Sequence, residues 1–224
     1  MEILGPEITS FLPEHLADNI LFDDRADAGR KLARILPCDL HDPVVVGTTR
    51  GGTEIAAEVA AALHAPLDVV AVTPVLCPEE YEYAVGAVAP GEAAYLRDHE
   101  KLSAAHTVVA VSRARKEAAR VDGLLHERRR AVPLRGRDLV LVDEAITTGA
   151  TMAAAIAWGR AGEARGIVTA APVGATAGLQ LVRGLADSVH CLYEAEVIGS
   201  RRIWFGYFPR PTDEDVRELL EATR

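Results

Sequence analysis

Two adjacent carboxylates, followed by a run of small residues, are the part of this sequence best suited to chemistry. Asp143 and Glu144 follow four aliphatic residues, Leu139-Val140-Leu141-Val142, which are typical of a buried parallel strand. Because an unpaired charge is costly to bury, both carboxylates are expected to face a crevice. The small residues after them predict a tight turn into a helix, whose N-terminus binds anions through free N–H groups and its dipole. Such a site suits a sugar phosphate, with the carboxylates accepting hydrogen bonds from vicinal hydroxyls.

The predicted phosphate turn leads into a helix with an apolar pattern from Met152 to Trp158. The alternative is an ordinary strand-turn-helix whose acidic residues only cap the helix. Two other phosphate-binding fingerprints, Gly-x-x-x-x-Gly-Lys-Ser/Thr and Gly-x-Gly-x-x-Gly, are absent, which favours the sugar-phosphate interpretation. The residues expected to form the turn are Ala145, Thr147, Thr148, Gly149, Ala150 and Thr151.

At these residues the chain resembles the type I phosphoribosyltransferases. Their diagnostic motif is four apolar residues, two acidic ones and a Thr/Gly-rich turn into a helix. The resemblance implies that Asp143 and Glu144 are the catalytic pair and hold the ribose hydroxyls of phosphoribosyl pyrophosphate (PRPP), while the turn holds its 5′-phosphate. It also implies Mg²⁺ as a cofactor bound through PRPP or pyrophosphate, with no direct protein ligand.

A second loop follows the first expected core strand, Val44 to Gly47. Paired glycines let the backbone approach a ligand or adopt a positive φ, and arginine offers a forked donor to phosphate oxygens. The family resemblance assigns this loop to pyrophosphate, although the segment alone would be read as a plain turn. The loop comprises Thr48, Thr49, Arg50, Gly51 and Gly52, and a helix from Thr53 to about Leu63 is expected after it.

The next expected strand, Leu67 to Thr73, departs from the family pattern. Relatives usually carry Arg-Lys at its end, where a basic residue commonly helps to hold pyrophosphate. This sequence has Thr73-Pro74 instead, a departure that bears on the strength of catalysis and not on the fold. Arg50 would then carry a larger share of the pyrophosphate contact.

The remaining pattern predicts one α/β domain, a doubly wound and mostly parallel sheet flanked by helices, with a small hood or flexible-loop addition. The elements expected outside the motifs are a helix starting near Asp24 with Ala28, Leu32 and Ile35 on one face, a strand at Tyr81–Ala89, a helix at Ala104–Arg130, a helix to about Ala161, a strand at Gly166–Val173, a helix at Ala175–Ala186, a strand at Ser188–Tyr193 and a helix at Asp213–Ala222. Residues 1–40 form an N-terminal lead and helix, 41–193 the core with an insertion at about 74–135, and 194–224 a C-terminal aromatic segment and helix. The apolar positions of residues 1–21 predict packing.

The insertion is rich in arginine. Residues 113–137 contain nine basic residues, which suit a solvated helix face, although Arg128 to Arg130 are candidates for contact with a ligand phosphate. His126, which lies among these arginines, is expected at the surface.

The C-terminal segment is unusually aromatic. Relatives place a similar segment over the acceptor, so the resemblance makes Trp204 and Phe205 a candidate acceptor hood. Packing of the terminal helix onto the sheet explains the same residues equally well.

Composition limits the function classes. The net charge is -9, and no separate basic domain is evident, which argues against a nucleic-acid binder. The three cysteines have no metal-ligand spacing and read as reduced cytoplasmic thiols. No signal peptide or membrane-spanning run is expected, and no Gly-x-Ser-x-Gly motif supports a hydrolase.

Two functional hypotheses remain. The first is a phosphoribosyltransferase, expected to be a homodimer, that transfers the phosphoribosyl group from PRPP to a base or amine with release of pyrophosphate. The second is a non-catalytic regulator that senses PRPP or a nucleotide with the same fold. The acceptor cannot be read from the sequence, because the segment that would select it has little pattern.

Overall fold

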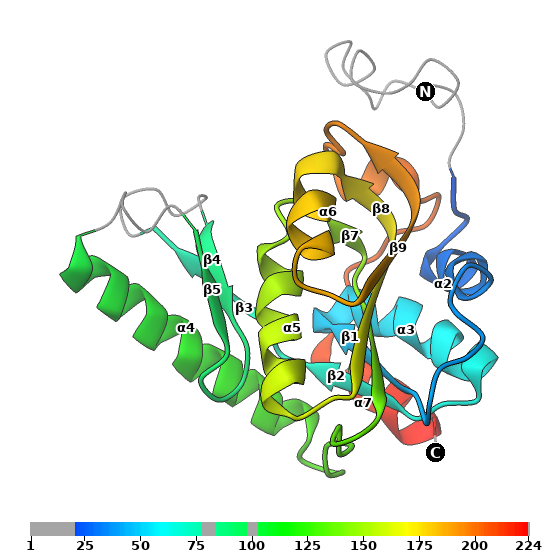
Figure 1. Cartoon of the computed structure of the whole chain (residues 1–224), viewed down its shortest axis with the longest axis horizontal. Coiled ribbons are helices and arrows are strands. Elements are labelled where there is room, and N and C mark those ends of the chain that lie inside the picture. The colour runs from blue at the N-terminus through cyan, green and yellow to red at the C-terminus, as the bar shows by residue number, and fades with distance from the viewer. Residues whose placement is uncertain (1–20, 78–83, 98–102, 224) are drawn as a thin grey trace.

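The computed structural model describes residues 21–77, 84–97 and 103–223, which form a large parallel sheet, a small antiparallel sheet and the helices around them (Figure 1). The packing expected of residues 1–20 and the first three residues of the strand expected at 81–89 lie outside the described residues.

The large sheet has six strands, and every pairing in it is parallel. Its order is β2-β1-β6-β8, with β9 on the other edge of β8 and the short β7 continuing the line of β6. The six strands are β1 (Val44–Thr48), β2 (Leu67–Val70), β6 (Asp138–Val142), β7 (Ala145–Ile146), β8 (Gly166–Ala175) and β9 (Ser188–Ala195).

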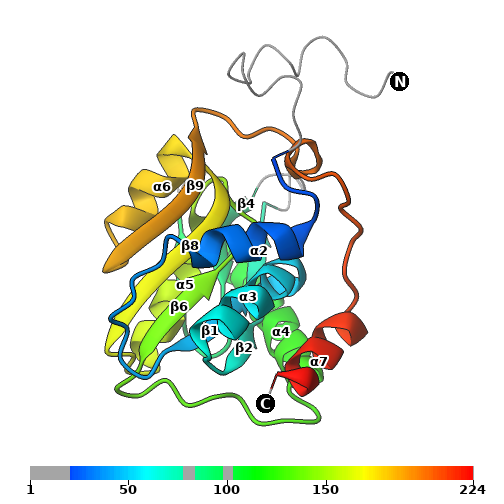
Figure 2. The ribbon, with the colours of Figure 1, turned by 90° about the vertical axis from the view of Figure 1, so that its right-hand side faces the viewer.

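Helices cover both faces of this sheet (Figure 2). One face carries α2 (Arg25–Ala33), α3 (Thr49–Leu63) and α7 (Asp213–Ala222), and the other carries α5 (Ala150–Ala161) and α6 (Thr176–Arg183). Side chains alternate between the two cores because successive strand residues point to opposite faces: Val45 packs on the first core, and Val44 and Val46 pack on the second. The predicted doubly wound sheet is thereby confirmed.

The insertion folds into a separate small layer. It contains β3 (Thr73–Leu76), β4 (Ala84–Val88), β5 (Ala94–Leu96) and the long helix α4 (Ala104–Leu125). Ala110, Ala114 and Ala118 recur every four residues, so they form one helix face that packs on the sheet. Helix α5 lies between this layer and the large sheet (Figure 1).

The strand order reverses between β1 and β6. From β1 the chain continues to β2 on one side, and it later returns to β6 on the other side. The helices that follow these two strands, α3 and α5, cover opposite faces. In open α/β sheets, ligands bind outside the carboxyl ends of the strands at such a switch point.

Several element boundaries differ from the sequence expectation. Strand β2 ends at Val70, and Thr73 begins β3 of the small sheet, where Pro74 is tolerated because β3 is an edge strand. Helix α3 begins at Thr49 instead of Thr53. Helix α2 ends at Ala33, which leaves Ile35 39% exposed and not on a buried helical face.

Helix α4 ends at Leu125, five residues before the predicted end at Arg130. His126 Nε2 lies 3.0 Å from Asp68 Oδ1, and the N–H of Val132 donates to Asp68 Oδ2 at 2.6 Å. Because both contacts reach the buried Asp68 of β2, the chain turns away from the helix axis. His126 is therefore not a surface residue, and its contacts with Asp122 and Asp68 raise its pKa to about 10.

Across residues 21–77, 84–97 and 103–223, no helix is both long and apolar enough to cross a membrane.

Candidate active site

The acidic pair lies at the interruption between β6 and β7. The two strands run along the same edge of β8, and Asp143 and Glu144 occupy the gap between them at the carboxyl end of β6. Each residue is 7% exposed. The carboxylates thus lie at the switch point, and they are buried instead of facing the crevice that the sequence predicts.

Asp143 carries a perturbed carboxyl group. Burial and the neighbouring charge of Glu144 raise the pKa of Asp143 to about 7, against the smaller opposing effect of the Glu144 N–H and the Thr48 hydroxyl. The Glu144 N–H donates to Asp143 Oδ1 at 2.8 Å. This carboxyl therefore gains or loses its proton near neutral pH, which is typical of functional sites.

Glu144 is neutralised by two arginines from distant parts of the chain. Arg25 Nε lies 2.5 Å from Glu144 Oε1, and Arg201 Nη1 lies 3.1 Å from Glu144 Oε2. These ion pairs explain how a carboxylate can be buried at the end of a hydrophobic strand.

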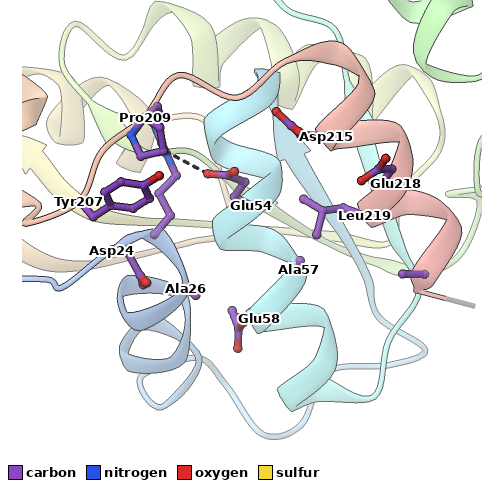
Figure 3. Close-up of a pocket in the computed structure, with 12 residues that line it drawn as sticks. Asp24, Ala26, Glu54, Ala57, Glu58, Tyr207, Pro209, Asp215, Glu218 and Leu219 are labelled. Carbon is purple, nitrogen blue, oxygen red and sulfur yellow. Dashed lines mark hydrogen bonds and ion pairs between the residues drawn. The ribbon is translucent and has the colours of Figure 1, made fainter.

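Arg25 also connects the acidic pair to a neighbouring cavity of about 540 Å³ between α2, α3 and α7 (Figure 3). Its guanidinium contacts Glu54 at 3.0 Å and the Pro209 carbonyl at 2.7 Å. Burial raises the pKa of Glu54 in spite of this arginine. The residues lining the cavity include none of those predicted for the site, so the acidic pair, not the cavity, is the better guide to the chemistry.

The predicted phosphate turn forms the start of α5. Thr147 and Thr148 are exposed, and Gly149 precedes the helix as its N-cap with a φ of 79°. The first-turn N–H groups of a helix have no partner within it, so this end offers donors to an anion. Ala145 and Ala150 are buried: Ala145 pairs with β8, and Ala150 and Thr151 open the helix.

Gly149→Ala is expected to destabilise the fold and to weaken ribose 5-phosphate binding. The positive φ disfavours any side chain, and a Cβ at Gly149 would lie 2.8 Å from the Gly178 carbonyl oxygen. Crowding of this kind costs roughly 1–3 kcal/mol beyond the backbone strain. Gly136→Ala is the matched control, because Gly136 has a φ of 76° with nothing near its Cβ position. Equal losses of unfolding free energy in the two variants, measured by chemical denaturation, would contradict the close packing.

The predicted pyrophosphate loop is the first turn of α3. The positive φ falls on Thr49, at 60°, and not on the paired glycines. The glycines instead let the backbone of α3 pack closely against the end of β6. A Cβ on Gly51 would collide with the Glu144 carboxylate, and one on Gly52 would lie 2.7 Å from the Val142 carbonyl oxygen.

The first turn of α3 thus lies directly on the acidic pair, which Thr48, buried at the end of β1, also adjoins. Arg50 points instead to α7, where its Nε lies 2.5 Å from Asp213 Oδ1.

The candidate hood residues are buried. Trp204 is 2% and Phe205 is 3% exposed, and the Phe205 ring lies between Phe22 and Phe208. The Trp204 Nε1–H donates to the Ile198 carbonyl at 2.8 Å. Here both residues pack the C-terminal segment against the start of α2, so their role in covering an acceptor stays a prediction.

Most arginines of the insertion are engaged with carboxylates or carbonyls. Arg128 lies 3.4 Å from both Glu214 and Glu221 of α7, and Arg129 donates to the Leu220 and Leu67 carbonyls. Other pairs join Arg115 to Glu92, Arg120 to Glu117, Arg135 to Glu163 and Arg137 to Asp42. These contacts favour a structural and surface role for this group over contact with a ligand.

Comparison with known proteins adds relatives to this geometry. Two proteins of Mycobacterium tuberculosis, named "Putative phosphoribosyl transferase" MT0597 and Rv0571c, are 36% identical over 207 residues, which cover 90% of this chain and 46% of each relative. The crystal structure of TT1426 from Thermus thermophilus has 32% sequence identity and a TM-score of 0.78, over 90% of this chain and 98% of that one. The chain belongs to the type I phosphoribosyltransferase family.

It spans about half the length of its mycobacterial relatives. No family model matches the chain.

Within this chain, the sequence pattern pointed to the acidic pair but not to the arginines that pair with Glu144. Arg25 stands alone among acidic residues at the start of α2, and Arg201 is one of two arginines before the aromatic tail. Neither has a local pattern that points to Glu144, 119 and 57 residues away. A general physical argument could have predicted arginine partners. A buried acidic pair requires cations, and lysine is rare beside arginine in this sequence.

Proposed function

We propose that the protein transfers the 5-phosphoribosyl group from PRPP to a nitrogen-containing acceptor and releases pyrophosphate. The observation that carries the proposal is the convergence at the switch point: two carboxylates at the end of β6 lie between the N-termini of α3 and α5. Two helix N-termini that can bind anions lie on either side of two carboxylates that can accept hydrogen bonds from a diol. This arrangement matches a sugar that carries a phosphate group at each end.

Each part of the site has an expected role. Asp143 and Glu144 accept hydrogen bonds from the ribose hydroxyls, and the turn at 147–151 holds the 5′-phosphate. The first turn of α3, with Arg50, holds pyrophosphate. The bond between C1 and the pyrophosphate oxygen breaks with its electrons leaving on pyrophosphate, and the acceptor nitrogen then forms the new bond to C1 and loses a proton. The carboxylates also favour the positive charge that develops on the sugar ring.

Magnesium fits this site as an ion carried by the substrate. Among the described residues, no group of three or more His, Cys, Asp or Glu side chains is placed to hold a metal ion. Glu144, whose carboxylate lies against Gly51 of the predicted pyrophosphate segment, is already paired with two arginines. Mg²⁺ usually binds through substrate phosphates and water, and it would neutralise charge on the leaving group.

The partners in the proposal are PRPP and a base or amine, in a cytoplasmic homodimer without nucleic acid. The three cysteines, Cys38, Cys77 and Cys191, are free.

The regulator hypothesis retains one supporting observation. Thr73-Pro74 replaces the family's basic pair, and Arg50 is the basic residue in the predicted pyrophosphate segment. A regulator would bind PRPP and leave it intact.

Incubation with PRPP, Mg²⁺ and a panel of bases and amines tests the proposal. We expect pyrophosphate release that depends on one class of acceptor, measured by a coupled assay and by mass spectrometry of the ribosylated product. Tight PRPP binding by calorimetry, without pyrophosphate release for any acceptor, would instead support the regulator.

A further inference from the structure

The two arginines that neutralise Glu144 differ in how firmly they are held. Arg25 is fixed: its side chain is 6% exposed, and besides Glu144 it contacts Glu54, the Pro209 carbonyl and the face of Phe208 at 3.9 Å. Removing its guanidinium from Glu144 would also disturb those contacts. Arg25 is thus a permanent counter-ion that orients one carboxylate oxygen.

Arg201 has an anchored backbone and a half-exposed side chain. The short helix η3 (Arg201–Trp204) is anchored by the buried Trp204, whose carbonyl accepts the Phe22 N–H at 3.1 Å. The Arg201 side chain is 53% exposed, and Glu144 is its only ion-pair partner in the described part of the chain. Because its guanidinium end reaches solvent and makes no second ion pair among the described residues, Arg201 can leave Glu144 without breaking a further ion pair.

The proposed function requires Arg201 to leave Glu144. Ribose hydroxyls have to reach the carboxylate, and Arg201 covers Glu144 Oε2, the oxygen that Arg25 leaves available. A neutral sugar would displace the guanidinium and give it no new anion. A sugar phosphate would displace it and supply a phosphate oxygen, which accepts strong charge-assisted hydrogen bonds from arginine.

We infer, on the basis of the proposed function, that Arg201 is a specificity-determining residue that makes the site select phosphorylated pentoses over neutral ones. It covers the carboxylate in the absence of ligand and moves to a ligand phosphate in the complex. The neutral riboside is rejected because Arg201 competes with it, and PRPP is favoured because Arg201 adds to its binding.

Arg201→Gln should weaken PRPP binding without weakening the binding of a neutral riboside. NMR titrations with PRPP–Mg²⁺ and with methyl β-D-ribofuranoside, a neutral sugar with the same diol, measure both. We expect PRPP to bind about 10-fold more weakly, as for the loss of one charge-assisted hydrogen bond, and the riboside to bind at least as tightly as to wild type. Arg201→Lys retains the charge and should keep most of the preference for PRPP.

Arg202→Gln is the matched control, because Arg202 is the next residue of η3, is exposed and has no ion pair among the described residues. It should leave both affinities unchanged. A parallel loss of PRPP and riboside binding in Arg201→Gln would show a merely structural role and overturn the inference, as would unchanged binding of both. Wild-type protein that fails to bind PRPP would overturn the proposed function itself, whereas normal PRPP binding with no shift in selectivity would overturn this inference alone.

Discussion

Asp143→Asn should lower the affinity for PRPP by about 10- to 100-fold, the equivalent of one or more charge-assisted hydrogen bonds, while stabilising the folded protein at pH 8. Asparagine keeps an oxygen for the Glu144 N–H that Asp143 accepts at 2.8 Å, so the local geometry can persist. It removes the negative charge that the ribose hydroxyl would meet. Calorimetric titration with PRPP–Mg²⁺ measures the loss, and unchanged affinity would contradict the assignment of the acidic pair.

The stability effect follows from the pKa of Asp143, which is raised from 3.8 to about 7 in the folded protein. Between these pH values only the folded state holds the proton. The stability contributed by this group is therefore complete below the unfolded pKa and is lost as pH rises through 7, by up to about 1.4 kcal/mol for each pH unit in between. Because asparagine does not titrate, the advantage of the variant should grow from pH 4 to pH 7 in urea denaturation series.

Asp138→Asn supplies a control of opposite sign at the start of β6, the strand that ends just before Asp143. Arg165 holds the pKa of Asp138 below its ordinary value, with help from the His41 N–H. The stability that the Asp138 carboxylate contributes is present above its unfolded pKa and is lost as pH falls through its lowered folded pKa. Asp138→Asn should thus be less stable than wild type at pH 7, with a difference that shrinks in acid. The same pH trend in both variants would mean that the trend does not come from these two carboxyls.

Arg50→Ala is expected to weaken PRPP and pyrophosphate binding by about 10- to 100-fold and ribose 5-phosphate binding by less than about 3-fold, since only the first two carry a diphosphate. Turnover should fall further than PRPP affinity, because negative charge on the leaving group increases in the transition state. Pyrophosphate release measures the loss of kcat, and calorimetry measures the loss of PRPP affinity. A larger loss of kcat would show that Arg50 acts on the leaving group in the transition state and not in binding alone.

Asp213→Asn is the matched control for Arg50. In this structure Arg50 pairs with Asp213 at the start of α7, so Arg50→Ala also removes a contact between α3 and α7. Asp213→Asn removes the same ion pair and leaves the guanidinium available. It should leave PRPP affinity unchanged or increase it. A loss as large as that of Arg50→Ala would assign the effect to docking of α7.

Local pattern alone determined much of this protein. The aliphatic run before the acidic pair predicts β6, and the small residues after it predict the N-terminus of α5, because burial and helix starts depend on neighbouring residues. Helix α7 spans Asp213–Ala222, as predicted, and its start carries a capping box between Thr212 and Asp215.

Tertiary structure decided the electrostatics of the site. The strand order brings Arg25, Glu144 and Arg201 together from three separate parts of the chain, and no periodicity records which cation neutralises which carboxylate. Tertiary structure also placed Thr73 in the small sheet and ended α4 at Leu125, where the following residues contact Asp68 of β2, because contacts with distant residues outweighed local helix and strand preference. The sequence by itself therefore determined which side chains are candidates for binding and catalysis. The packing of distant segments determined their charge state, because a carboxylate is neutralised by the cations that lie near it in space and not by those near it in sequence.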